Sequence, residues 1–232
     1  MKEIIFAEFQ KAGVPLSLEA AEKLDDLAAF MLEYNQKVNL TRITEPTDVA
    51  EKHYLDSILP LTMLDVPRGT KCADVGTGAG FPALPMMIAR PDLKFTLIDS
   101  LGKRITYLAL ALDKLGLSAE LLHARGEDAA RDQALREQFG FVTARAVAPL
   151  NVLCEYCLPF VEVGGVFAAL KGADDEASSA AKAIDLLGGR LERVEKYALP
   201  SGDRRSLVVI GKDRPTPLRY PRAGGAIAKK PL

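Results

Sequence analysis

Cysteine and histidine are scarce in this chain, and tryptophan is absent. Among 232 residues there are three cysteines, two histidines and no tryptophan. So few cysteines exclude a disulfide framework and favour a reducing compartment, so we expect a cytoplasmic protein. Cys154 and Cys157 have the spacing of half a zinc site, but no second pair exists, so no metal is expected. Because the surrounding segment 150–160 is otherwise apolar, both are predicted to be small core residues on a helix.

Long apolar runs are missing as well. No segment approaches the roughly 18 apolar residues of a membrane span, and the residues after Met1 do not form an apolar leader. We therefore expect a soluble protein without a membrane partner, and the sequence implies no obligate protein partner. The net charge is only −1, so any binding of nucleic acid must come from a local basic patch.

Three common catalytic signatures are also absent. The chain has no G-x-x-x-x-G-K-[ST] phosphate loop, since Gly102-Lys103 is followed by Arg104. It has no G-x-S-x-G nucleophile elbow and no H-E-x-x-H metal motif. These absences argue against P-loop kinases and GTPases, serine hydrolases of the elbow type and zinc peptidases.

What the chain does contain divides into three parts, of which the first is helical. In residues 1–65, apolar side chains such as Leu24, Leu27 and Met31 recur at helical spacing. Ser17 precedes this pattern and is predicted to be the N-cap of the helix. We expect these helices to form an extension packed on the core that follows.

Residues 66–212 alternate between strand-like and helix-like runs, which predicts a parallel sheet covered by helices on both faces. The last two strands are joined by a short turn, so they can form a hairpin with a reversed strand at one edge. The expected fold is α/β, with a seven-stranded, mostly parallel sheet, an antiparallel edge strand and N-terminal helices. The basic tail 213–232 is rich in proline and glycine and is expected to be extended or mobile. The strands are predicted at Lys71–Val75, Lys94–Asp99, Glu120–His123, Phe141–Ala144, Val166–Lys171, Arg190–Ala198 and Leu207–Gly211.

The most informative segment is a glycine-rich turn between a predicted strand and a predicted helix. It reads Asp74-Val-Gly76-Thr-Gly78-Ala-Gly-Phe81-Pro, and Asp99 ends the next apolar run about 20 residues further on. Glycines let the backbone approach a ligand where a Cβ would collide, and Asp99 can accept hydrogen bonds from both hydroxyls of a ribose. The G-x-G-x-G spacing and the Asp74 carboxylate do not suit a pyrophosphate. They suit S-adenosylmethionine, which has a ribose and an ammonium group but no phosphate. A tight structural turn is the alternative. Together with this turn, seven strands with a reversed edge strand match the usual methyltransferase sheet, so the expected fold is a Rossmann-like S-adenosylmethionine-dependent methyltransferase fold.

Later strand ends carry further candidates, and in an open α/β sheet ligands bind beyond the carboxyl ends of the strands. Gly126 and Glu127 follow the third predicted strand, and an acid beside a glycine can contact an adenine amine. Arg145 ends the fourth strand and Lys171 the fifth. Each has a plainer interpretation, because Glu127 can cap a helix and Arg145 can pair with a surface acid. Their recurrence at successive strand ends favours one shared site.

Longer strings resemble the RsmG family, also called glucose-inhibited division protein B, whose members methylate N7 of a guanine in bacterial 16S ribosomal RNA. The resemblance runs from about residue 35 to the end of the chain. The matching strings are Asn39-Leu40-Thr41, His53-Tyr54-Leu55-Asp56-Ser57, the glycine turn from Asp74 to Pro82, Asp99-Ser100-Leu101-Gly102-Lys103-Arg104, Arg145-Ala146-Val147-Ala148 and Ala169-Leu170-Lys171-Gly172.

The resemblance implies methyl transfer from S-adenosylmethionine to a guanine of 16S ribosomal RNA, with the RNA or the small-subunit particle as partner. It implies that Gly76 and Phe81 contact the cofactor and that Gly126 and Glu127 lie by its adenine. It places Arg145 at the mouth shared by cofactor and substrate. Gly126 stands where other members can have alanine, which leaves the backbone contact in place.

The expected chemistry needs few catalytic groups. Guanine N7 is an unprotonated acceptor, so no general base is expected, and catalysis is expected mainly from proximity and alignment. Arg145 is the candidate positioning residue, gripping a phosphate or O6 of guanine with its fork of donors. The candidates for RNA-backbone contacts, each of which can also be an ordinary solvated charge, are Lys103, Arg104, Lys171, Arg204 and Arg205.

Other functions stay open at this point. The chain can be an S-adenosylmethionine-dependent methyltransferase of a protein or a small molecule, which its near-neutral net charge favours. It can also be a non-catalytic binding protein of ribosome assembly. A nicotinamide oxidoreductase is opposed by the glycine spacing and by Asp74. The segment from Arg145 lacks the Pro-Pro loop of enzymes that methylate exocyclic amines and the Pro-Cys of those that methylate cytosine carbon-5.

Overall fold

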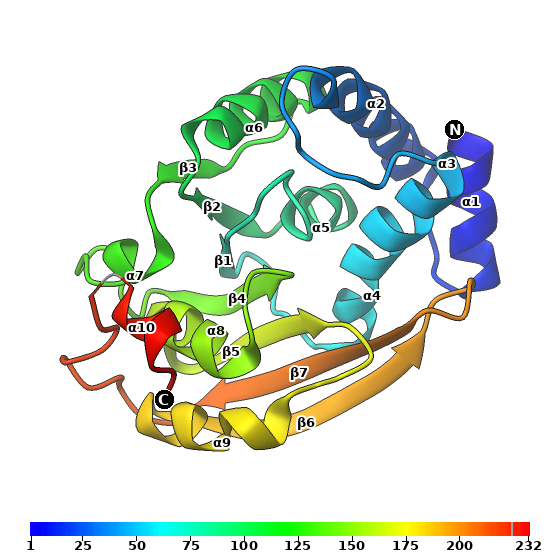
Figure 1. Ribbon diagram of the computed structural model, residues 1–232. Coiled ribbons are helices and arrows are strands. Elements are labelled where there is room, and N and C mark those ends of the chain that lie inside the picture. Colours follow the sequence, from blue (N-terminus) through cyan, green and yellow to red (C-terminus); the bar gives the residue numbers. More distant parts are fainter. Residues whose placement is uncertain (224) are drawn as a thin grey trace.

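The computed structural model describes residues 1–223 and 225–232, and it is built around a twisted sheet (Figure 1). In these residues the sheet has seven strands in the order β3-β2-β1-β4-β5-β7-β6. Neighbours among the first five strands are parallel, whereas β7 is antiparallel to both β5 and β6. This confirms the predicted mostly parallel sheet with a reversed strand in its edge hairpin. The strands are β1 (Lys71–Val75), β2 (Lys94–Asp99), β3 (Glu120–His123), β4 (Phe139–Arg145), β5 (Val161–Lys171), β6 (Gly189–Ala198) and β7 (Arg204–Lys212).

The central strands are buried on both faces, as a sheet between two helical layers requires. Every residue of β1 and of β2 after the first is buried, so side chains on both faces of these strands are covered rather than on one face only. The bounds of β1, β2 and β3 match the prediction to the residue. The fifth strand begins at Val161 instead of Val166, because the ladder continues past an irregularity between Phe139 and Phe141.

Helices precede the sheet, as predicted for residues 1–65. Ser17 is the N-cap of α2, and its hydroxyl accepts a hydrogen bond of 3.1 Å from the amide of Ala20. The segment from Val49 to Leu55 is a π-helix, a form that its sequence did not predict. The helices of this part are α1 (Lys2–Lys11), α2 (Leu18–Asn35), α3 (Pro46–Asp48), the π-helix η1 (Val49–Leu55) and α4 (Asp56–Met63).

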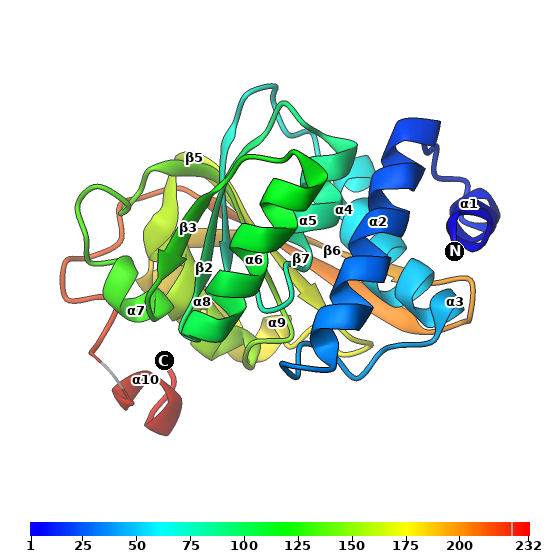
Figure 2. The ribbon, with the colours of Figure 1, turned by 90° about the horizontal axis from the view of Figure 1, so that it is seen from above.

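The remaining helices complete the two layers (Figures 1 and 2). One face of the sheet is covered by α5, α6 and the N-terminal helices, which share one hydrophobic cluster; Phe30 of α2 stacks on Tyr107 of α6 at 5.6 Å between ring centroids. The other face is covered by α7, α8 and α9, which share a second cluster. The division at residue 65 stays a prediction. These helices are α5 (Ala83–Ala89), α6 (Gly102–Leu115), α7 (Gly126–Ala129), α8 (Leu150–Cys157), the 3-10 helix η2 (Leu158–Phe160), α9 (Ala177–Leu186) and α10 (Ala226–Lys229).

The described part of the tail is mostly irregular, but it contains α10, a short helix that the prediction of an extended tail missed. Arginine side chains from other parts of the fold bind its backbone. Arg131 donates to the carbonyl of Pro221 at 2.7 Å, and Arg136 donates to that of Tyr220 at 2.9 Å. The tail is therefore held against the second helical layer along much of its length.

The cysteines lie in the core, as predicted. Cys154 and Cys157 are fully buried on α8, and burial raises the pKa of both thiols, which keeps them protonated. Among the described residues, no three His, Cys, Asp or Glu side chains are grouped as a metal site would require. Within residues 1–223 and 225–232, none of the helices has both the length and the apolar character that a bilayer crossing needs.

Candidate functional site

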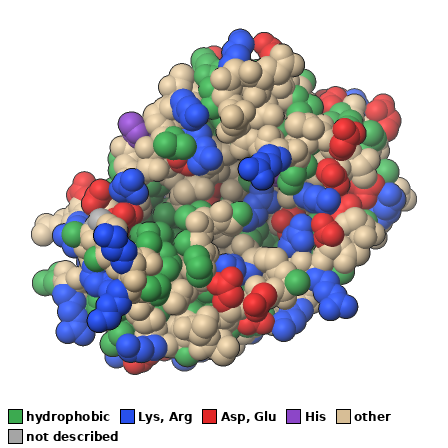
Figure 3. Space-filling model, in the orientation of Figure 1, with side chains coloured by type: hydrophobic (Ala, Val, Ile, Leu, Met, Phe, Trp, Pro, Cys, Tyr) green, Lys and Arg blue, Asp and Glu red, His purple; other side chains and the backbone are tan. Residues whose placement is uncertain are grey.

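A cavity of about 560 Å³ opens where the parallel strands end, at what we call the carboxyl edge of the sheet. Its wall includes Gly76, Asp99, Gly126 and Glu127, four of the predicted cofactor residues. Arg104, predicted to bind RNA, also lines this first cavity. Figure 3 shows the molecule hollowed near the centre of the face in view, with hydrophobic side chains along one side and Lys and Arg side chains around it.

The glycine turn reaches the wall of the first cavity at Gly76, and two of its glycines are required by geometry. Gly76 has φ +74°, and a Cβ there would lie 2.7 Å from Cγ2 of Val147. Gly80 has φ +88°, and a Cβ there would overlap the side chain of Leu84. Larger residues would therefore be strained and would push the neighbouring segments apart. The turn is not an ordinary loop, because it needs glycine both for its conformation and for its close packing.

Asp99 links this turn to the next helix. Its Oδ2 accepts a hydrogen bond of 2.9 Å from the amide of Gly78, and its Oδ1 accepts one of 2.9 Å from the amide of Leu101. Arg104 donates to Oδ2 at 3.3 Å, so that oxygen has two partners, whereas Oδ1 has one. A carboxylate has about four acceptor positions. Asp99 therefore keeps a free position on Oδ1, and a second becomes free when Arg104 turns away.

Asp74 lies beneath the turn. Within the described residues it is not on the wall of the first cavity, and it is 1% exposed. Its Oδ1 accepts a hydrogen bond of 2.9 Å from the hydroxyl of Thr143, while its Oδ2 is buried without a partner, as is the hydroxyl oxygen of Thr77. Burial raises the pKa of Asp74 to about 6, against the lowering effect of the nearby hydroxyls and Arg145. Both residues are buried beneath the turn, and the Thr77 hydroxyl is close enough to Asp74 to lower the pKa of its carboxyl group.

Three other predicted cofactor residues, Gly78, Phe81 and Arg145, are likewise absent from the wall of the first cavity as far as the structure describes the chain. Arg145 lies in a second cavity of about 230 Å³, which adjoins the first because Ala146 lines both. Lys171 and Arg205, two of the predicted RNA-binding residues, also line it. The structure thus brings together three predicted cations beside the first cavity.

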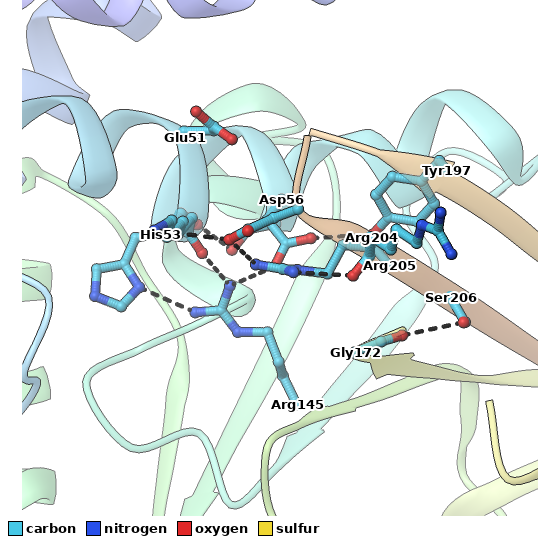
Figure 4. A network of polar contacts seen from close by, with 12 residues as sticks. Glu51, His53, Asp56, Arg145, Gly172, Tyr197, Arg204, Arg205 and Ser206 are labelled. Carbon is cyan, nitrogen blue, oxygen red and sulfur yellow. Dashed lines mark hydrogen bonds and ion pairs between the residues drawn. The ribbon is translucent and has the colours of Figure 1, made fainter. Parts of the chain in front are cut away.

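The guanidinium of Arg145 is held by the N-terminal helices (Figure 4). It donates to the carbonyl of Lys52 at 2.9 Å, to Oδ2 of Asp56 at 3.4 Å and to Nδ1 of His53 at 3.3 Å. It also lies over the ring of Phe81, 5.4 Å from the ring centroid. These contacts come from three separate segments, so Arg145 joins the glycine turn and the π-helix to the end of β4.

Asp56 is the acid at the centre of the second cavity, and sequence analysis did not select it as a site residue. Besides Arg145, its carboxylate accepts hydrogen bonds from Nε of Arg205 at 3.4 Å and from the hydroxyl of Tyr197 at 3.0 Å. Only 6% of its side chain is exposed. One buried carboxylate therefore compensates two arginines. The sequence did contain a hint of Asp56, because the string His53–Ser57 resembles the RsmG family, but no role was given to that string.

His53 and Phe81 form the boundary between the turn and the second cavity. Their rings are stacked at 4.2 Å between centroids with an interplanar angle of 6°. Burial, and secondly the charge of Arg145, lowers the pKa of His53 to about 3. The imidazole is therefore neutral near neutral pH and can accept a hydrogen bond from Arg145 at Nδ1.

The remaining predicted cations differ in their surroundings. Lys103 and Arg204 are exposed. Lys171 donates to the carbonyl of Ala148 at 3.1 Å and forms an ion pair of 3.0 Å with Glu176. The exposed pair has its charge available to a partner, whereas Lys171 is partly committed to the loop after β4.

Comparison with known proteins gives a consistent result. The model of the GidB family, described as rRNA small subunit methyltransferase G, matches residues 20–207. A ribosomal RNA small subunit methyltransferase G of Lactobacillus johnsonii is 47% identical, over 99% of this chain and 99% of that protein. One of Pelotomaculum thermopropionicum is 44% identical, over 100% of this chain and 99% of that protein.

Solved structures share the fold at low sequence identity. An S-adenosylmethionine-dependent O-methyltransferase of Thermotoga maritima matches with a TM-score of 0.54 and 16% identity, over 81% of this chain and 73% of that chain. A variant of the 16S rRNA (adenine(1408)-N(1))-methyltransferase of Catenulisporales acidiphilia matches with a TM-score of 0.55 and 16% identity, over 67% of this chain and 88% of that chain. The fold is therefore that of Rossmann-like methyltransferases. By its family match and its near full-length relatives, the chain belongs to the GidB family, the rRNA small subunit methyltransferases G.

Proposed function

We propose that the protein transfers a methyl group from S-adenosylmethionine to N7 of a guanine in 16S ribosomal RNA of the small ribosomal subunit. The observation that carries this proposal is the junction of two cavities at the carboxyl edge. The first is lined by Asp99 and by glycines, and the second contains Arg145, Lys171 and Arg205. Family membership supports the reaction and the RNA substrate, and the geometry supports the roles that we propose for the residues.

The first cavity fits the cofactor. Its volume of about 560 Å³ lies within the range of small-molecule sites. Asp99 offers an acceptor position for a ribose hydroxyl, and Glu127, 5% exposed, offers a carboxylate for an adenine amine. Asp74 and Thr77 are buried beneath the turn, and we propose that they support the turn rather than contact the ammonium group of the cofactor. Carboxylates at these places would repel a pyrophosphate, which opposes a nicotinamide cofactor.

The chemistry assigned to the protein is mainly positioning. When bound, S-adenosylmethionine supplies an electrophilic methyl group. Guanine N7 has a free lone pair on its Hoogsteen edge, so no side chain must remove a proton before transfer. The neutral His53 is hydrogen-bonded to Arg145 and needs no role as a base. The residues of the site align the two substrates and exclude water, which is the contribution expected from proximity.

Arg145 serves as the positioning residue at the substrate side. Three of its five N–H donors are used by Lys52, His53 and Asp56, which leaves two for a phosphate or for O6 of guanine. Arg205 and Lys171 add positive charge to the same cavity. The exposed Lys103 and Arg204 are proposed to contact the RNA backbone farther from the reacting base.

The test is a methylation assay with radiolabelled S-adenosylmethionine on naked 16S ribosomal RNA and on small subunits from a strain that lacks the enzyme. We expect label in the RNA, and strand scission at one guanine after borohydride and aniline, which cleave at 7-methylguanine. Asp99→Ala is the control variant for the cofactor site. Label in ribosomal protein instead of RNA would replace this proposal by protein methylation. RNA label without scission would assign another atom.

A further inference from the structure

The end of the tail reaches the first cavity, although Ala228 is 72 positions along the chain from Tyr156, the nearest other residue of the cavity wall. Ala228 and Pro231 line the cavity together with Val152 and Tyr156 of α8. These four side chains are largely apolar, in contrast to the carboxylates of Asp99 and Glu127, which line the same cavity. Figure 1 shows α10 next to α8, and the two helices are in contact.

A buried ion pair fixes the tail in this place. The guanidinium of Arg222 binds both carboxylate oxygens of Glu155 on α8, with Nη2 to Oε2 at 2.6 Å and Nε to Oε1 at 3.0 Å. The Glu155 carboxylate is fully buried, and it also accepts the backbone N–H of Arg222 at 2.7 Å. Paired hydrogen bonds of this kind have a defined geometry, so they set the course of the chain beyond them.

Two further contacts orient the last residues. Nη1 of Arg222 donates to the carbonyl of Lys230 at 2.8 Å, so the same arginine holds the chain on both sides of α10. Ile227 of α10 is fully buried, whereas Ala228 and Pro231 keep exposed surface. The tail therefore presents a small apolar surface to the cavity from a segment that is anchored elsewhere.

We propose that residues 226–232 form part of the cofactor site and cover the adenine half of the bound cofactor. This proposal rests on the proposed function. In this proposal Asp99 binds the ribose. Val152, Tyr156, Ala228 and Pro231 line the same cavity and provide the apolar surface that the face of a purine ring requires. Glu127 lies at the same end to accept from the exocyclic amine.

Exchange of cofactor for product then depends on the tail. Loss of this cover exposes one face of the adenine to water, which weakens binding by removing apolar contact area. We expect both S-adenosylmethionine and its demethylated product to be affected, because the adenosine is common to the two. Dissociation is expected to accelerate more than association slows, as is usual for a change within one binding surface.

The experiment compares the full chain with a chain that ends at Gly225 and with the point variant Ala228→Asp. Calorimetry measures the Kd of S-adenosylmethionine and of S-adenosylhomocysteine, and stopped-flow fluorescence measures the dissociation rate. We expect the Kd to rise about tenfold or more in both variants. Thermal unfolding without ligand checks that each variant is folded, and Ala228→Asp covers the case in which the truncated chain is not.

Lys229→Ala is the matched control, because Lys229 is the exposed next residue of α10 and is not part of the cavity wall. Its Kd is expected to stay within twofold of the full chain. If the full chain binds and both tail variants bind equally well, the tail has no part in the site and this proposal is overturned. If the full chain itself binds neither ligand, the proposed function fails instead.

Discussion

The carboxylate of Asp99, at the end of β2, accepts a hydrogen bond of 2.9 Å from the backbone N–H of Gly78, in the turn that follows β1. The two residues are 21 positions apart in the chain. The acid that is proposed to bind the ribose therefore also holds the glycine turn in place. Cofactor binding and turn conformation are expected to respond together when either partner is changed.

Replacement of Asp99 by alanine is expected to weaken cofactor binding by about tenfold or more. The variant loses a charged acceptor for the ribose and two hydrogen bonds to backbone amides, each worth about 1.5–3 kcal/mol when the acceptor is charged. Calorimetric titration with S-adenosylhomocysteine measures the change. Asp99→Asn keeps the shape and one acceptor and is expected to lose less. Equal affinity in all three proteins would remove Asp99 from the site.

Gly76→Ala is expected to lower cofactor affinity and stability more than Gly78→Ala does. Both glycines have positive φ, so each alanine has a backbone cost of about 1–2 kcal/mol. Only at Gly76 does the added Cβ also meet Val147, at 2.7 Å; at Gly78 the nearest atom is 3.9 Å away. The double variant Gly76→Ala, Val147→Ala is expected to recover part of the affinity. Absence of any recovery would show that the clash is not the cause.

Asp56→Ala is expected to reduce the free energy of unfolding by about 3 kcal/mol, because it leaves two arginines without their buried counter-charge. Tyr197→Phe removes one hydrogen bond to the same carboxylate and is expected to cost about 1 kcal/mol. Urea unfolding followed by circular dichroism measures both. The prediction is wrong if the two variants lose the same amount.

Two buried groups are expected to give opposite pH dependences of stability. The folded pKa of His53, about 3, is below its unfolded value of 6.5, so its contribution is present above pH 6.5 and is lost as the pH falls toward 3. The folded pKa of Asp74, about 6, is above its unfolded value of 3.8, so its contribution is present below 3.8 and is lost as the pH rises through 6.

The two contributions can be separated by substitution. When the pH falls from neutral, His53→Gln is expected to lose less of its free energy of unfolding than the unchanged chain does. Asp74→Asn is expected to lose stability more steeply on acidification. The slope changes by at most about 1.4 kcal/mol per pH unit for one group. Urea unfolding between about pH 4.5 and pH 7 measures the slopes. Parallel profiles for all three proteins would contradict both assignments.

Lys103→Ala and Arg204→Ala are each expected to weaken RNA binding and to reduce the slope of log K against log salt concentration by about 0.7–0.9. Both side chains are exposed, and they precede Arg104 and Arg205, which line the two cavities. Lys94→Ala is the control, since Lys94 is also exposed but begins β2, at the opposite edge of the sheet. Filter binding of ribosomal RNA at several salt concentrations gives the slopes. A control slope that falls as much as the others would indicate general charge screening.

The sequence allowed good prediction of the parts that depend on local pattern. The bounds of β1, β2 and β3 follow from apolar runs that end at polar residues, and Ser17 follows from the preference of helices for a hydroxyl at the N-cap. Gly76 and Asp99 were selected as candidate cofactor residues because Gly76 follows the first predicted strand and Asp99 ends the next one, an order that can be read directly along the chain. These features need no knowledge of distant partners.

The second cavity was not predictable in the same way. Asp56 is 89 positions from Arg145 and 149 positions from Arg205 in the chain, so no local sequence pattern predicts that these side chains pair. The RNA contact of Arg104 stays a prediction, but the ion pair of this residue with Asp99 on the wall of the first cavity was not predicted. The tail was expected to be extended because proline and glycine dominate it, but the buried carboxylate of Glu155 holds it. In each case the position of the side chain or segment depends on a partner that is distant in the sequence, and the residue's own local pattern does not reveal that partner.

The reversed direction of β7 changes which residues can reach the carboxyl edge. The parallel strands contribute there only the residues with which they end, such as Arg145 of β4. Because β7 runs the opposite way, it begins at that edge, where Ser206 pairs with Lys171. Arg205 is thus supplied by the opening residues of a strand that is bonded on both sides. The backbone of Arg205, one cation of the second cavity, is therefore fixed by the sheet. Insertions or deletions in the hairpin turn 199–203 can alter the surroundings of this side chain while its backbone stays in register.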